Sequence, residues 1–131
     1  LDKTVKLWNP QDGSLLTTLK GHSHGVNAIA YSPDGAILAS ASHDNTVKLW
    51  NAQDGSLLTT LQGHANWVNA IAYSPDGTTL ASASHDNTVK LWNVKFDLNL
   101  DSAIAYAREW LRNYLTHNPN VSASDKRLLE I

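Results

Sequence analysis

Several residue types that would define a function are absent or scarce in this sequence. The chain has 131 residues and no cysteine, which excludes disulfides, a cysteine nucleophile and thiolate metal sites and is compatible with a reducing compartment. Its 10 Lys+Arg and 12 Asp+Glu give a formal net charge of −2, too balanced to favour nucleic acid or an anionic membrane. No apolar run approaches the roughly 20 residues of a membrane helix, and residues 1–6 lack the features of a signal peptide. We therefore predict a cytoplasmic protein with neither a nucleic-acid nor a membrane partner.

What the sequence does contain is an internal repeat. Residues 3–44 align on residues 45–86 with a period of 42, and only eight aligned positions differ, so 34 are identical. A third copy begins at Asn87 and stops after Asn93. The chain has no initiator methionine and opens in the middle of this pattern, so we interpret it as a piece of a longer or trimmed chain. Identity at this level indicates one structural unit repeated along the chain.

Each period contains four short runs that are typical of strands. They cover residues 26–32, 37–42, 46–51 and 56–61. The turns between them contain Ser-Pro-Asp-Gly at 32–35, Asn45 where φ is expected to be positive, and Asp-Gly at 54–55. Apolar side chains lie on both faces of a strand, with Val47 and Leu49 on one side and Trp50 on the other. Four hairpin-linked strands covered on both faces predict an all-β propeller built from stacked four-stranded antiparallel blades.

Two recurring dipeptides resemble motifs of WD40 repeats. Gly21-His22 and Gly63-His64 are similar to the Gly-His dipeptide of that family. The Trp-Asp position is occupied each time by Trp-Asn, at residues 8–9, 50–51 and 92–93. The resemblance covers residues 1 to about 93 and implies a β-propeller that binds protein or peptide partners. The near-identical copies also resemble recently amplified cyanobacterial WD40 propellers.

The resemblance also implies a buried hydrogen-bond network in each blade. Its members carry over to His22, Ser40, Asp44 and Trp50, and one period later to His64, Ser82, Asp86 and Trp92. The chemistry is consistent, because a carboxylate accepts from imidazole, the imidazole meets the hydroxyl and the hydroxyl reaches the indole N–H. Trp8 occupies the same position in the repeat, but the sequence contains no partners for its network.

Catalytic and metal-binding interpretations of these residues are disfavoured. Ser40, His22 and Asp44 are the residue types of a hydrolase triad, but the same set recurs one period later and no Gly-x-Ser-x-Gly elbow is present. His43 and His85 precede turn aspartates and are interpreted as turn caps, and the six histidines show no spacing typical of zinc. We predict no enzymatic activity, no cofactor and no metal.

The loop before the innermost strand carries the most informative differences between the copies. Ser23-His24-Gly25 stands where the next copy has Ala65-Asn66-Trp67. Loops on a rigid scaffold often bind partners, which makes His24, Asn66 and Trp67 a candidate binding loop. The alternative, favoured because large aromatic residues usually bury most of their area, is that Trp67 packs against the neighbouring blade.

Residues 97–131 have helical rather than strand periodicity and resemble the segment that closes many cyanobacterial WD40 proteins. One apolar stripe predicts a helix that ends near Asn118-Pro119: Leu100, Ile104, Ala107, Leu111 and Tyr114. This tail either binds a partner or, as we favour, docks on the propeller and covers an open edge strand.

The predicted organisation is a partial blade at 1–19, a full blade at 21–61, a three-stranded blade at 63–93 and the helical tail at 97–131. Nine strands cannot close a ring, which takes typically 4–8 blades. The chain is then either a fragment of a longer propeller or one of several copies that self-associate through blade edges. The predicted function is a non-enzymatic scaffold or sensing module for protein or peptide, and the alternative is a structural segment that self-assembles into a closed multi-chain propeller.

Overall fold

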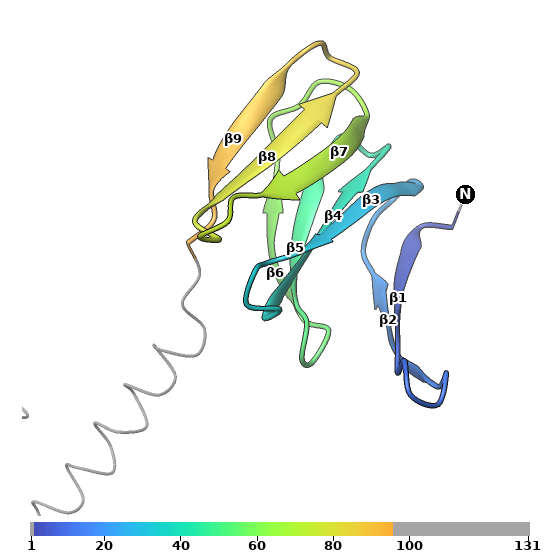
Figure 1. Ribbon diagram of the computed structural model, residues 1–131. Helices are drawn as coiled ribbons and strands as arrows, with labels where there is room; N and C mark the ends of the chain where they lie inside the picture. The colour runs from blue at the N-terminus through green and yellow to red at the C-terminus, as the bar shows by residue number, and fades with distance from the viewer. Residues whose placement is uncertain (1, 96–131) are drawn as a thin grey trace, which may run out of the picture. The chain divides into compact units, whose positions relative to one another are not determined.

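The computed structural model describes residues 2–95, which form nine strands in three antiparallel sheets (Figure 1). The first sheet has the order β1-β2, the second β3-β4-β5-β6 and the third β7-β8-β9. Their bounds are β1 Thr4–Trp8, β2 Leu15–Lys20, β3 Val26–Tyr31, β4 Ile37–Ser42, β5 Val47–Asn51, β6 Leu57–Leu61, β7 Val68–Tyr73, β8 Thr79–Ser84 and β9 Val89–Asn93. The all-β prediction is confirmed. The predicted helical tail lies outside the described residues.

The turn chemistry explains why the strands end where they do. Asn45 and Asn87 have φ of 73° and 69°, as expected for the tight turns that follow β4 and β8. Gly35 has a φ of 75° in the turn between β3 and β4, a conformation that a side chain would strain. Because the turns repeat, the registers repeat as well: Leu38 lies opposite Trp50 and Leu80 opposite Trp92.

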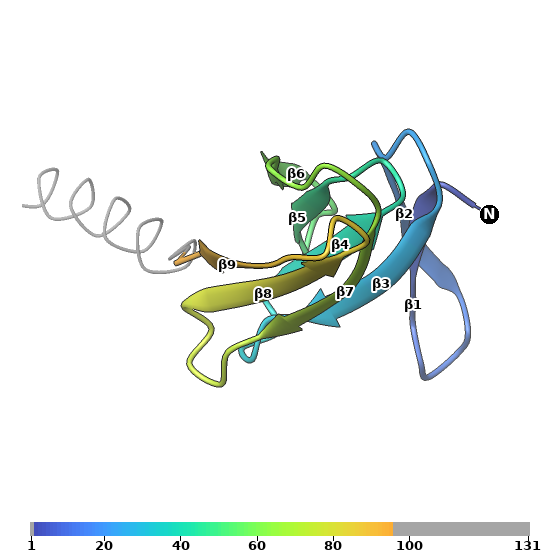
Figure 2. The same ribbon diagram turned by 90° about the horizontal axis from the view of Figure 1, so that it is seen from above.

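Apolar side chains from two sheets form the core between them. Val5, Leu7 and Leu19 of the first sheet cluster with Leu38 and Trp50 of the second, and all five are buried. The second and third sheets meet where β3 lies beside β7 (Figure 2), and there the Asn27 side-chain amide donates to the backbone oxygen of Val68 at 3.0 Å. No helix in this part of the chain is long and apolar enough to cross a membrane.

Strands of identical sequence differ sharply in solvent exposure. Val47 and Leu49 of β5 are 0% exposed, whereas the same residues of β9, Val89 and Leu91, are 66% and 72% exposed. At the other end of the array, Trp8 is 55% exposed although Trp50, its counterpart, is 2% exposed. The cause is the number of neighbouring sheets. The second sheet has one on each face, whereas among residues 2–95 the first and third sheets have one on a single face only.

Candidate functional site

A chain of three hydrogen bonds crosses the second sheet from its rim to its core. Asp44 follows β4, and its Oδ2 lies 2.7 Å from Nδ1 of His22, which precedes β3. Nε2 of His22 lies 2.7 Å from Oγ of Ser40 on β4, and the same oxygen accepts from Nε1 of Trp50 on β5 at 2.8 Å. The four side chains that the resemblance implied are therefore brought together.

The same arrangement recurs in the third sheet. His64 Nδ1 lies 2.8 Å from Asp86 Oδ2, His64 Nε2 lies 2.7 Å from Ser82 Oγ, and Trp92 Nε1 donates to that oxygen at 2.8 Å. The close approach of the indole explains the glycine before each histidine: a Cβ at Gly21 would lie 3.1 Å from the Trp50 ring. The Gly-His dipeptide is thus a packing requirement of the network.

A neutral imidazole satisfies every donor and acceptor in these bonds. The Asp44 carboxylate can only accept, so His22 Nδ1 donates to it, Nε2 accepts from the Ser40 hydroxyl, and Ser40 accepts from the indole. Burial lowers the pKa of His22 and outweighs the opposing effect of Asp44. Burial alone would raise the pKa of Asp44, but hydrogen bonds from Thr46 and His22 hold it below its usual value. The network therefore consists of neutral His22 and ionised Asp44.

The network contains the residue types of a hydrolase triad, but its serine hydroxyl is not accessible to a substrate. Ser40 is 0% exposed and Ser82 is 1% exposed, and each Oγ already binds both an imidazole and an indole. A nucleophile must reach a substrate carbonyl, which a fully enclosed mid-strand hydroxyl cannot do. In addition, the described residues contain no group of three or more His, Asp or Glu side chains that could hold a metal.

The lowered pKa of His22 predicts that stability falls in mild acid. Folding disfavours the protonated imidazole, so the free energy of unfolding should decrease as pH drops below about 6.5, the value of an unfolded histidine. Asp44, whose pKa is also lowered, adds a further loss at lower pH, below about 4. Urea unfolding midpoints at pH 7 and pH 5 measure the first effect. In His22→Gln the decrease between these pH values should be smaller, and an undiminished decrease would contradict the assignment.

Three aromatic rings join the second and third sheets at the rim that carries the loops before β3 and β7. The ring of Trp67 stacks on that of His43, with centroids 4.2 Å apart and planes inclined by 9°. His85 meets the same indole at 5.4 Å in an edge-on arrangement. We call His43, Trp67 and His85 the rim cluster. Trp67 remains 45% exposed within it, so it both contacts the neighbouring sheet and faces solvent.

The backbone holds the rim cluster in place. His85 N donates to Trp67 O at 2.9 Å, and in the preceding copy His43 N donates to Gly25 O at the same distance. Asn66 Oδ1 accepts from Trp67 N at 2.8 Å, whereas exposed His24 contacts only its neighbour Ser23 through its ring. The turn-cap interpretation of His43 and His85 thus missed their ring contacts. The available signal was a tryptophan that replaces glycine in one copy only.

Geometry and sequence agree on the class of the protein. The second sheet is four-stranded and antiparallel and carries this network, as does the three-stranded third sheet, which is the form of β-propeller blades. The sequence pattern described as "WD domain, G-beta repeat" matches residues 13–51 and 55–93. The chain therefore belongs to the WD40-repeat family.

Similar proteins include other members of this family, each over about one repeat. "WD repeat-containing protein VIP3" of Arabidopsis thaliana is 53% identical over 45 residues, which are 34% of this chain and 14% of that protein. "Small ribosomal subunit protein RACK1y" of Oryza sativa subsp. japonica is 49% identical over 43 residues, 33% of this chain and 13% of that protein. "Lissencephaly-1 homolog 1" of Paramecium tetraurelia is 44% identical over 43 residues, 33% of this chain and 11% of that protein. The aligned segments thus span a small part of these relatives, and the resemblance to amplified cyanobacterial propellers stays a prediction.

Proposed function

We propose that this chain is a non-enzymatic cytoplasmic scaffold that binds a protein or peptide at the rim cluster. The observation that carries the proposal is Trp67, a large side chain that is held rigidly yet is 45% exposed. Binding energy in protein interfaces concentrates on such aromatic anchors, because they bury a large area with little loss of conformational freedom.

The surroundings of Trp67 support this role. His43 covers one face of the indole and His85 contacts it edge-on, so the ring is already fixed before a partner arrives. His24 and Asn66 lie on the loops of the same rim and offer polar groups beside the apolar anchor. A partner with an apolar or aromatic side chain flanked by polar groups would match this surface. The two networks, being enclosed, would serve to hold the blades that present it.

Peptides selected from a random display library on the immobilised protein provide the test. We expect Trp67→Ala to weaken their binding by tenfold or more, in line with an anchor worth at least about 2 kcal/mol. Tyr31→Ala is the control, because Tyr31 is an aromatic residue of similar exposure, 52%, at the opposite end of β3. Equal binding by Trp67→Ala, or equal losses in both variants, would contradict a site at the rim cluster.

We propose self-association as a second function, on a different observation. Val89 and Leu91 at one end of the array and Trp8 at the other are exposed, whereas the same residues inside the array are buried. Large exposed apolar faces mark interaction sites. The two exposed faces are complementary, because each equals one half of an interface that the chain already forms between its own sheets. This function predicts a native mass above the 14.3 kDa of one chain.

A further inference from the structure

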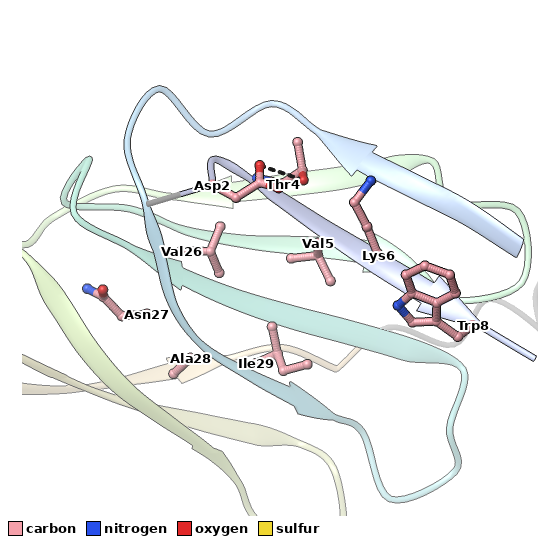
Figure 3. A pocket seen from close by; sticks show the side chains of 9 residues that line it. All are labelled: Asp2, Thr4, Val5, Lys6, Trp8, Val26, Asn27, Ala28 and Ile29. Atoms are coloured by element: carbon pink, nitrogen blue, oxygen red, sulfur yellow. Dashed lines mark hydrogen bonds between the residues drawn. The ribbon is translucent and has the colours of Figure 1, made fainter. Parts of the chain in front are cut away.

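The first and third described sheets each lack strands that the second sheet has. β9 pairs with β8 on one side, and β1 pairs with β2 on one side; residues 2–95 supply no strand for the other edge of either. A pocket of about 480 Å³ lies beside β1, between Thr4, Lys6 and Trp8 of that strand and Val26, Ala28 and Ile29 of β3 (Figure 3). In the second sheet, β4 pairs with the side of β5 that corresponds to the unpaired side of β1. The pocket is therefore the place of a missing inner strand.

β1 and β9 carry the same residues. The hexapeptide Thr-Val-Lys-Leu-Trp-Asn occurs at residues 4–9, which include β1, and again at residues 88–93, which include β9. In the third sheet β8 pairs with β9 so that Leu80 lies opposite Trp92. Since pairing depends on the residues and their register, β8 is equally matched to β1 of a second copy, with Leu80 opposite Trp8.

The hairpin of β1 and β2 also has the form that would complete the third sheet. Its register matches that of β5 and β6: Val5 lies opposite Leu19 as Val47 lies opposite Leu61. Both hairpins carry the same irregularity just before the tryptophan. Placed beside β8, the hairpin would therefore supply the third and fourth strands that β5 and β6 supply in the complete second sheet.

We propose that the β1–β2 hairpin of a second copy displaces β9 and completes the third sheet in the order β7-β8-β1-β2. The same step places β8 of the first copy in the pocket beside β1 of the second. This inference rests on the self-association proposed above and is independent of peptide binding at the rim cluster.

The exchange breaks few apolar contacts and forms more. Displaced β9 gives up few apolar contacts at Val89 and Leu91, which are already 66% and 72% exposed. Val5 and Leu7 of the second copy take their place. These two side chains are already buried, at 6% and 8% exposed, against the second sheet of the copy to which they belong. The bond from Trp92 to Ser82 is lost, and an equivalent bond from Trp8 replaces it. Burial of Trp8 is offset by exposure of Trp92, which is half-buried before the exchange. The net gain is the cover that the second copy brings to the exposed face of the third sheet, together with a fourth strand supplied by β2.

The geometry limits the size of the assembly. Each exchange turns a two-stranded and a three-stranded sheet into one four-stranded blade, so every copy contributes two complete blades to the ring. Because propellers close with about 4–8 blades, the assembly should contain about two to four copies. The native mass should then be a small integer multiple of 14.3 kDa.

Two substitutions at equivalent positions should affect assembly differently. Trp8→Ala removes a side chain that the exchange buries, so at least tenfold more protein should be needed to reach the oligomer. Trp92→Ala weakens only the strand that is displaced, so the oligomer should form at the same or a lower concentration. Sedimentation or light scattering over a dilution series measures both. Oligomers weakened equally by the two substitutions, or more by Trp92→Ala, would overturn the exchange.

Disulfide trapping tests the register directly, because the chain has no cysteine of its own. Thr79 lies opposite Asn93, so in the exchanged form it lies opposite Asn9 of the second copy. A non-hydrogen-bonded antiparallel pair places Cα atoms about 4.5 Å apart, within reach of a disulfide. Oxidation of Thr79→Cys/Asn9→Cys should link two chains. The matched variant Thr79→Cys/Asn93→Cys should form its disulfide within one chain, lock β9 in place and yield monomers.

The outcomes separate the inference from the function on which it rests. An oligomer in which Thr79→Cys/Asn9→Cys gives no linked chains overturns the exchange but leaves self-association standing. A wild-type chain that stays monomeric at all concentrations overturns both. Linked chains together with monomeric Thr79→Cys/Asn93→Cys support both.

Discussion

Trp50→Ala is expected to lower the free energy of unfolding by about 3–5 kcal/mol, one of the two largest effects that we expect of a single substitution among the described residues. Trp50 is 2% exposed and lies in the cluster that joins the first and second sheets. Alanine would leave a cavity among Val5, Leu7 and Leu38, and it would deprive Ser40 of the indole donor. Because a domain of this kind has a total stability of about 5–15 kcal/mol, the urea midpoint should fall severely.

Trp50→Phe separates the two parts of this effect. Phenylalanine keeps most of the apolar volume and loses the N–H that donates to Ser40, so the loss should be smaller than that of alanine. Tyr31→Ala serves as the exposed control and should change the free energy of unfolding by less than about 0.5 kcal/mol. Midpoints are compared at one protein concentration, since self-association would add to stability. A Trp50→Ala midpoint equal to that of Tyr31→Ala would refute the central place of this side chain.

Local chemistry is the part of the fold that the sequence could predict. The positive φ of Asn45 follows from its place in a tight turn, and the strand positions follow from a period of 42 residues punctuated by such turns. The meeting of His22, Ser40 and Trp50 also follows, because the family resemblance assigned these residue types to one blade. These features depend on residues within a single repeat, which the sequence presents twice.

Exposure could not be predicted in the same way. Val47 and Val89 stand in the same hexapeptide, yet one is 0% and the other 66% exposed, because only the first has a neighbouring sheet on that face. The stacking of Trp67 on His43 was missed for a related reason. The two residues belong to different sheets, so their contact depends on how the blades pack and not on the pattern within a repeat.

Leu49→Ala is the second substitution with a large expected effect, about 2–5 kcal/mol. Leu49 is 0% exposed on β5, where it faces away from Trp50 along the strand and is covered by the neighbouring sheet. Alanine would leave a cavity in a contact between two sheets, which relaxes only in part because each sheet is held by its own backbone hydrogen bonds. Urea unfolding measures the loss as a lower midpoint.

Leu91→Ala is the matched control, because Leu91 stands in the same sequence on β9 but is 72% exposed. Its free energy of unfolding should change by less than about 0.5 kcal/mol. This expectation holds for an isolated chain, where Leu91 has no cover among the described residues. It also holds after strand exchange, where Leu7 of a second copy replaces it. A loss at Leu91 as large as that at Leu49 would mean that the face of β9 is covered by another element, and it would contradict the displacement of this strand.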